Sequence, residues 1–248
     1  INVNGTINLI KAMQKHNCKV MVFSSSATIY GYPDVVPIPE LATINPLNPY
    51  GNTKATIESF LSDIAGCSNT KLIKATSNNG WKIARLRYFN PVGAHPSGLI
   101  GEDPKGAPSN LFPYINQVAI GKIKSLQIFG DNWPTHDGTG VRDYIHVMDL
   151  AEGHCAALEN LLLEKPQLLT LNLGTGKGTS VIEVLKAFEK ITDKKIPYEI
   201  VSRRTGDSPI AIADVTMAKK IINWQPKKGL EEMCRDSWRW QISNTSGY

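Results

Sequence analysis

Apolar residues recur along the chain at two spacings, one typical of helices and one typical of strands. Ile7, Leu9, Ile10 and Met13 fall at helical spacing and predict a helix over about residues 3–16. The short apolar runs at 19–23 and 81–87 are typical of buried strands. The same patterns predict further helices at 50–65, 111–121, 149–162, 180–191 and 229–242, and further strands at 125–129, 142–146, 168–172 and 197–201. Because strands alternate with helices, we expect an α/β fold with a doubly wound parallel sheet.

The composition changes near residue 90. The stretch "NPVGAHPSGLIGEDPKGAPSN" at 90–110 is dense in glycine and proline, so we expect no regular structure there. We therefore place a domain boundary at this point. Residues 1–89 would be the C-terminal part of one domain, and residues 90–248 would form a second mixed α/β domain, smaller than the whole of the first. We also expect the chain to return to the first domain around 142–165.

Charge and composition narrow the class of protein. The net charge of +5 is modest, and lysine and arginine are spread along the chain without a basic block, which argues against a nucleic-acid partner or a membrane-binding patch. No apolar run approaches the roughly 18 residues of a membrane span. The four cysteines, Cys18, Cys67, Cys155 and Cys234, are far apart and predict free thiols in a reducing compartment, the cytoplasm. His146 and His154 have no third ligand at useful spacing, so we expect no metal site.

The stretch "YGNTK" is the first candidate for chemistry. Tyr50 and Lys54 are four residues apart and project from the same face of the predicted helix. A lysine ammonium beside a phenol favours the phenolate, which can take and return a proton near neutral pH. The spacing alone fits a solvated helical pair equally well, so position must decide between the two interpretations.

Polar side chains also follow two of the predicted strands. Three serines, 24–26, follow the strand at 19–23, and Tyr88, Phe89 and Asn90 follow the strand at 81–87. In open α/β sheets, ligands bind outside the carboxyl ends of the strands. These groups and the start of the Tyr50 helix converge if the two strands are neighbours, although a polar loop cap would also explain the serines.

The arrangement resembles the extended, nucleotide-sugar branch of the short-chain dehydrogenase/reductases. The signs are a serine after a strand, then Tyr-x-x-x-Lys, then a strand that ends in "RYFN". The segments "SSSATIYG", "LRYFNPVGAHPSGLIGEDP" and "DGTGVRDYIHVMDLAEGH" are similar to those of the UDP-glucose 4-epimerase family, and the resemblance covers the whole chain. Related 4,6-dehydratases carry Thr-Asp-Glu where this chain has three serines.

The resemblance implies a Rossmann-like NAD-binding domain, of which residues 1–89 are the C-terminal part, and a nucleotide-sugar-binding domain at 90–248. It implies NAD as cofactor and reversible C4 epimerisation of UDP-glucose and UDP-galactose through a 4-keto sugar, in galactose metabolism. Tyr50 would be the base, Lys54 would favour its phenolate and hold the cofactor ribose, and Ser26 would bind the sugar hydroxyl. The cofactor-binding positions that it implies are Ser24, Ser26, Tyr50, Lys54, Tyr88 and Phe89.

The resemblance also implies a UDP-sugar-binding set and a homodimer, with the helix at 50–65 as a candidate for the dimer contact. The substrate-binding positions are Ser26, Tyr50, Asn90, Asn110, Leu111, Gln127, Phe129, Arg142, Arg204, Asp207 and Ala211. Arg142 and Arg204 would bind the diphosphate, and Phe129 would contact the uracil. Two positions depart from the family's pattern. Gln127 stands where a small residue is expected, and Ala211 stands where members restricted to glucose and galactose often have tyrosine, so N-acetylated sugars are a further candidate substrate.

The glycine-rich stretch "LNLGTGKGTS" at 171–180 resembles a dinucleotide-binding fingerprint, but Thr179 replaces the third glycine. We interpret it as a structural loop of the substrate domain. The chain begins "INVNGTINLIKAMQKH", without an initiator methionine and already in a predicted helix. We expect a longer protein in which roughly 90 preceding residues, about two or three βα units, hold the real fingerprint, and we expect these 248 residues alone to be inactive.

Two other functions stay open. The chain could belong to a nucleotide-sugar-binding regulatory module without catalysis, although such a module has no need of an activated phenol. It could also be a related nucleotide-sugar dehydratase or epimerase, against which the serine triplet and the "GTGVRDYIHVMDL" segment argue.

Overall fold

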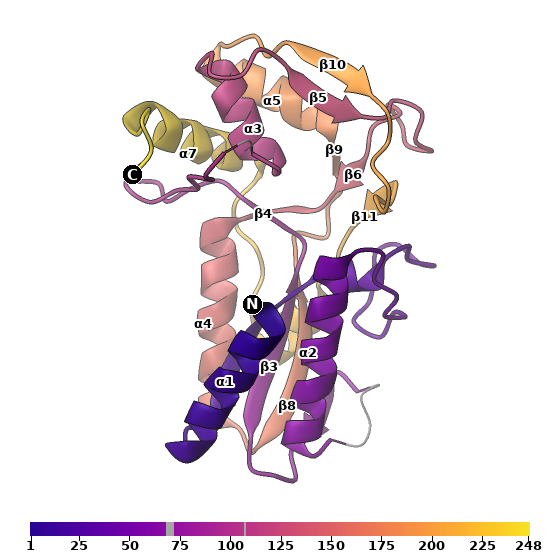
Figure 1. Cartoon of the computed structure of the whole chain (residues 1–248), viewed down its shortest axis with the longest axis vertical. Helices are drawn as coiled ribbons and strands as arrows, with labels where there is room; N and C mark the ends of the chain where they lie inside the picture. The colour runs from indigo at the N-terminus through magenta and orange to yellow at the C-terminus, as the bar shows by residue number, and fades with distance from the viewer. Residues whose placement is uncertain (68–71, 107) are drawn as a thin grey trace. The chain divides into compact units, whose positions relative to one another are not determined.

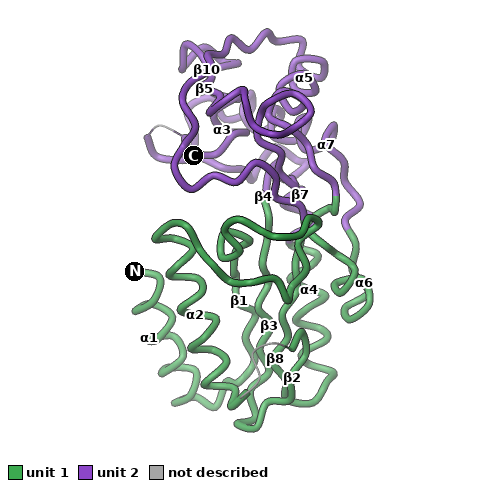
Figure 2. Tube along the Cα trace, turned by 90° about the vertical axis from the view of Figure 1, so that its right-hand side faces the viewer, with its two compact units in different colours: residues 1–89, 151–176, 213–225 green, residues 90–150, 177–212, 226–248 purple. Residues whose placement is uncertain are grey.

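The computed structural model describes residues 1–67, 72–106 and 108–248 and divides into two compact units (Figure 2). Unit 1 comprises Ile1–Phe89, Ala151–Gly176 and Ala213–Gln225, and unit 2 comprises Asn90–Leu150, Lys177–Ile212 and Pro226–Tyr248. The chain therefore passes from one unit to the other several times. The functions that we assigned to the two domains stay predictions.

Unit 1 is built on a four-stranded sheet with the order β1-β3-β8-β2. Its two middle strands, β3 and β8, are labelled in Figure 1. Strands β1 (Val20–Ser26), β3 (Lys82–Tyr88) and β8 (Gln167–Leu173) are parallel, and β2 (Lys74–Thr76) is antiparallel to β8. Ser26 pairs with Tyr88, and Tyr88 pairs with Leu173, so the three parallel strands end together. This common edge is where an open α/β sheet binds ligands.

Helices cover both faces of this sheet. In Figure 2, α1 (Asn2–Lys15) and α2 (Pro49–Ala65) lie on one side, and α4 (Val147–Leu163) and α6 (Thr216–Ile222) lie on the other. Buried side chains of α1, α2 and the strands form the core on the first side, among them Ile10, Ile57, Leu61, Trp81 and Ile83. The expected doubly wound α/β fold class is confirmed.

The local sequence fixes both ends of α2. The Asn48 side chain accepts a hydrogen bond from the Gly51 amide at 2.8 Å, and Pro49 occupies the first turn, where its missing N–H costs nothing. Gly66 ends the helix in the left-handed conformation, with φ of 68°, which glycine adopts without steric cost. A short 3-10 helix, η1 (Ala27–Tyr30), follows β1 directly and packs against α2.

Unit 2 holds three small sheets and three helices within its described residues. β4 (Asn90–Val92) pairs with β7 (Tyr144–His146), and β5 (Leu126–Phe129) pairs with β10 (Tyr198–Val201). β6 (Val141–Arg142) lies between β11 (Ile210–Ala211) and β9 (Thr179–Ser180). Helices α3 (Leu111–Ala119), α5 (Val181–Thr192) and α7 (Leu230–Ser243) contribute to a core that includes Phe112, Ile115, Leu185 and Phe188.

The predicted helices and strands are confirmed, with three corrections. Regular structure does occur in the glycine- and proline-rich stretch, because β4 pairs with β7; Ala107 of this stretch lies outside the described residues. The strand expected at 142–146 is two strands, since β6 and β7 pair in different sheets. β1 includes the three serines that we placed after it.

Candidate active site

The three serines end β1 and alternate in direction, as successive residues of a strand do. Ser25 is buried, and its hydroxyl donates to the Glu58 carboxylate on α2 at 2.5 Å. Ser24, on the opposite face, is exposed and hydrogen-bonds the side chain of Tyr88 on the neighbouring strand. The strand therefore fixes α2 with one serine and leaves its neighbours for the edge of the sheet.

Lys54 reaches from α2 to the end of β1. Its Nζ donates to the Ser24 carbonyl oxygen at 2.8 Å and lies 5.1 Å from the centroid of the Phe23 ring. The same Nζ lies 5.6 Å from the centroid of the Tyr50 ring, so the ammonium stands beside the phenol. Burial lowers the pKa of Lys54. Tyr50 is 48% exposed, so its phenol is accessible to a substrate.

Ser26 is held by the first turn of η1. Its Oγ accepts hydrogen bonds from the Thr28 amide at 3.2 Å and from the Thr28 hydroxyl at 2.9 Å. Neither bond uses the proton of Ser26 itself. The hydroxyl is thus oriented by two donors and keeps its own O–H for a ligand oxygen.

A second tyrosine lies beside the first. The Tyr88 hydroxyl is 3.3 Å from Nε2 of His154, on α4. Burial raises the pKa of Tyr88, the hydrogen bond with Ser24 opposes this rise, and the proximity of Tyr50 adds to it. His154 was considered in the sequence only as a metal ligand. Its place beside Tyr88 depends on the packing of α4, for which the sequence carries no local signal.

Phe89, the next predicted cofactor-binding residue, is mostly buried at the end of β3. It is 7% exposed, and its amide donates to the Leu173 carbonyl at 3.1 Å. The structure thus brings Ser24, Ser26, Tyr50, Lys54 and Tyr88 to one edge of the sheet. Phe89 follows β3 there and is bound to β8 through its backbone.

The donor set at this edge fits a dinucleotide ribose and a sugar hydroxyl. An ammonium has three donors, and the Ser24 carbonyl accepts from one of them, so Lys54 has two left for ribose hydroxyls. The phenol of Tyr50 and the hydroxyl of Ser26 can exchange and share a proton with a substrate alcohol. Proton transfer next to a bound nucleotide cofactor is the chemistry that this arrangement supports.

Unit 2 gathers the predicted phosphate and uracil contacts. The Arg204 guanidinium lies 4.5 Å from the centroid of the Phe129 ring, and its Nε donates to the Asp207 carboxylate at 3.1 Å. Burial lowers the pKa of Arg142. The positive charge of Arg204 lowers it further, and the negative charge of Asp207 raises it in part. Ala211 pairs with Arg142 in the β11–β6 register. Two guanidinium groups and one carboxylate leave this cluster positive, which suits a diphosphate.

The other predicted substrate contacts lie on separate elements of unit 2. Asn90 begins β4, and its amide donates to the Asp143 carbonyl at 3.0 Å. Asn110 immediately precedes α3 and donates through its side chain to the Glu102 carboxylate at 2.9 Å, and Leu111 is the first residue of that helix. Gln127 is exposed on β5, two residues before Phe129.

The glycine-rich segment that imitates a dinucleotide fingerprint has a packing role. A Cβ on Gly178 would lie 2.5 Å from the side chain of Ile212 and 2.6 Å from that of Val141, so any larger residue would have to displace these side chains. The segment runs from β8 in unit 1 to β9 in unit 2, and its interpretation as a structural loop of the substrate domain stays a prediction. Within the described ranges, no group of three or more histidine, cysteine, aspartate or glutamate residues is placed to hold a metal ion.

Comparisons with known proteins agree with one another. A model of the NAD dependent epimerase/dehydratase family matches residues 1–174. The UDP-glucose 4-epimerase of Bacillus subtilis is 53% identical over all of this chain and 70% of its own length, and UDP-glucose 4-epimerase 2 of Arabidopsis thaliana is 51% identical over 68% of its length.

Solved structures give the same result. The UDP-glucose 4-epimerase of Stenotrophomonas maltophila, with bound NAD and formylated UDP-arabinopyranose, has a TM-score of 0.91 and 48% identity over 98% of this chain and 69% of its own. The Bifidobacterium longum enzyme, in complex with NAD+ and UDP, also has a TM-score of 0.91, with 46% identity over 100% of this chain and 70% of its own. The chain therefore belongs to the NAD dependent epimerase/dehydratase family, and these relatives within it are UDP-glucose 4-epimerases.

Proposed function

We propose that this protein catalyses the NAD-dependent, reversible C4 epimerisation of UDP-glucose and UDP-galactose, through a 4-keto sugar, in galactose metabolism. The observation that carries the proposal is the position of the Lys54 ammonium, which binds the Ser24 carbonyl and stands beside the Tyr50 ring. A solvated helical pair has no such link to a strand end. The relatives that cover the whole chain are UDP-glucose 4-epimerases, which supports the same reaction.

Tyr50 acts as the base in this proposal. Its phenolate accepts the proton of the sugar C4 hydroxyl and returns it after the sugar has turned over. The positive charge of Lys54 stands beside the Tyr50 ring, with Nζ 5.6 Å from its centroid. Ser26, with its Oγ oriented by Thr28, donates to the sugar oxygen and holds it within reach of Tyr50.

NAD, when bound, supplies the two-electron acceptor and donor that oxidation and reduction at C4 require. Of the predicted cofactor-binding residues, Lys54 has donors left for the ribose, and Ser24, Tyr50 and Tyr88 lie at the same strand ends. NAD in the solved structures of two relatives supports this cofactor.

Unit 2 supplies the anchor for UDP in this proposal. Arg142 and Arg204 bind the diphosphate, Asp207 orients Arg204, and Phe129 contacts the uracil, with the sugar turning over while the diphosphate stays bound. UDP in the Bifidobacterium longum structure supports this ligand class. The small side chain of Ala211, opposite Arg142, leaves room for N-acetylated sugars as further substrates.

Two further assignments belong to the proposal. We place the protein in the cytoplasm because its four cysteines are free thiols. We also propose a homodimer, which light scattering on the purified protein tests directly. Among the described residues, no helix combines the length and the apolar character needed to cross a membrane.

The test uses protein expressed from its complete coding sequence. Incubation with UDP-galactose and NAD should produce UDP-glucose until both sugars reach equilibrium, as followed by NMR of the sugar protons. Binding of UDP-galactose in calorimetry without any conversion would contradict the proposal and favour a regulatory binding module.

A further inference from the structure

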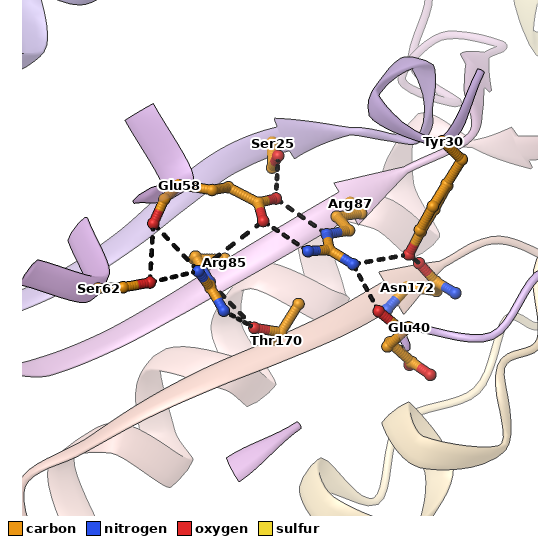
Figure 3. A network of polar contacts seen from close by, with 9 residues as sticks. All are labelled: Ser25, Tyr30, Glu40, Glu58, Ser62, Arg85, Arg87, Thr170 and Asn172. Carbon is orange, nitrogen blue, oxygen red and sulfur yellow. Dashed lines mark hydrogen bonds and ion pairs between the residues drawn. The ribbon is translucent and has the colours of Figure 1, made fainter. Parts of the chain in front are cut away.

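A buried polar network joins α2 to the sheet below the candidate active site (Figure 3). Its centre is the carboxylate of Glu58, a residue that is 1% exposed. Glu58 lies four residues after Lys54 and eight after Tyr50, so the three side chains lie along one face of the helix. The network therefore begins one helical turn below the catalytic lysine.

Glu58 and Lys54 fasten the same helix to the same strand. Lys54 Nζ binds the Ser24 carbonyl at 2.8 Å, and the Glu58 carboxylate accepts from the Ser25 hydroxyl at 2.5 Å. Successive turns of α2 thus bind successive residues of β1. Two links of this kind fix both the rotation of the helix about its axis and its position along the strand. A single link would leave one of these free.

The carboxylate is held rigidly and in its charged form. Arg87 on β3 donates to both of its oxygens, at 2.9 Å and 2.6 Å, and both side chains are buried. Burial would raise the pKa of Glu58, but the hydrogen bonds and charge of Arg87, with Arg85 and Ser25, outweigh burial and lower it. A bidentate ion pair of this geometry strongly limits how far the carboxylate can move.

Arg87 extends the network to the segment that leads into α2. Its Nη1 donates to the Tyr30 hydroxyl at 3.0 Å and to the Glu40 carbonyl at 2.7 Å. Tyr30 in turn donates to Asn172 on β8 at 2.7 Å. Both the face of α2 and the segment before its N-terminus are therefore tied to the same strands.

We propose that Glu58 is a positioning residue for the proton-transfer groups, acting through Ser25 to set α2 on β1 so that Lys54 and Tyr50 face the strand end. This inference rests on the proposed function of that strand end. It differs from a purely stabilising role, because cutting the Glu58–Ser25 link should impair turnover more than an equal loss of stability elsewhere on the helix does.

The matched variants are Ser25→Ala and Ser62→Ala. Both serines are fully buried, and each makes one hydrogen bond to a charged side chain, Ser25 to Glu58 and Ser62 to Arg85 at 2.9 Å. The Ser62 hydroxyl also donates to the backbone carbonyl of Glu58 within α2, at 3.0 Å, so only Ser25 links the Glu58 carboxylate to β1. Ser62 lies eight residues beyond Lys54, about 12 Å along the helix. The two variants therefore remove similar interactions at different distances from the active site.

Both variants should lower the melting temperature by a similar amount. Ser25→Ala should lower kcat for UDP-galactose about tenfold with KM within about twofold, because misplacement of reacting groups affects turnover more than binding. Ser62→Ala should leave kcat within about twofold of the wild type. Equal kcat for the two variants would overturn the proposal.

A second measurement does not depend on activity. Hydrogen exchange of the amides at 50–58 should be faster in Ser25→Ala than in Ser62→Ala, since only the first variant frees the catalytic turns of α2. Equal exchange in the two variants would overturn the positioning role. Wild-type protein that binds UDP-galactose without converting it would refute the proposed function, and this exchange comparison would still decide the role of Glu58.

Discussion

Gly51→Ala tests whether α2 depends on a close contact that only glycine allows, apart from the gain in helical propensity that alanine brings. Gly51 follows Tyr50 in the first turn of α2, and a Cβ there would lie 2.8 Å from the Thr28 carbonyl oxygen and 2.9 Å from Cβ of Pro46. The first contact is about 0.6 Å short of the 3.4 Å at which ordinary contact begins. The first turn of α2 must therefore move away from η1, and Tyr50 must move with it.

The matched control is Gly5→Ala in α1, where an added Cβ meets nothing within 4 Å. Alanine stabilises an open helical position by about 0.4–1 kcal/mol relative to glycine, so Gly5→Ala should raise the free energy of unfolding by this amount. The same gain applies at Gly51, but overpacking costs about 1–3 kcal/mol. The two variants should therefore differ by about 1–3 kcal/mol, with Gly51→Ala the less stable.

Urea denaturation followed by circular dichroism measures the stabilities, and conversion of UDP-galactose measures activity. Gly51→Ala should lower kcat about tenfold, because a shift of half an ångström or more misplaces Tyr50, while Gly5→Ala should keep wild-type activity. A Gly51→Ala protein as stable and as active as Gly5→Ala would show that α2 does not depend on close approach to η1.

Three further outcomes are expected. Lys54→Met should fold but lose at least about 100-fold in kcat, because the ammonium beside the phenol is removed; a loss below fivefold would contradict its role. Burial lowers the pKa of His146 below its ordinary value of 6.5, and the opposing effect of Asp236 is smaller. On acidification, His146 therefore becomes protonated more readily in the unfolded state than in the folded state. The free energy of unfolding should fall as the pH drops below about 6.5, with a smaller fall in His146→Gln, and a wild-type stability that rises on acidification would contradict this. Ala211→Tyr should reduce turnover of UDP-N-acetylglucosamine more than that of UDP-glucose, and equal reductions would show that this position does not set the sugar pocket.

Local patterns were sufficient to predict the main candidates of unit 1 and its longer elements, but not η1, β2 or α6. The Tyr50–Lys54 spacing, the serines and Tyr88 all follow from periodicity and from the rule that ligands bind at the carboxyl edge of parallel strands. The β1–β3 pairing, with Ser26 opposite Tyr88, then brings these residues to one edge. Each of these features is either local in the chain or follows from the sheet topology.

The features that the sequence did not reveal depend on contacts between distant residues. Glu58 resembles an ordinary charged residue of an amphipathic helix, and its burial depends on distant partners, above all Arg87, on a strand 29 residues later. His154 reaches Tyr88 across 66 residues. β4 forms in a stretch rich in proline because β7 supplies a partner, which outweighs the low local propensity.

Replacement of the base tests the central claim most directly. Tyr50→Phe removes one oxygen from a side chain that is 48% exposed, so the fold and the binding of UDP should not change. We expect interconversion of UDP-galactose and UDP-glucose, measured by NMR at saturating NAD, to fall by at least about 100-fold, while UDP affinity in calorimetry stays within about twofold. A Tyr50→Phe protein that interconverts the two sugars at the wild-type rate would show that the base lies elsewhere.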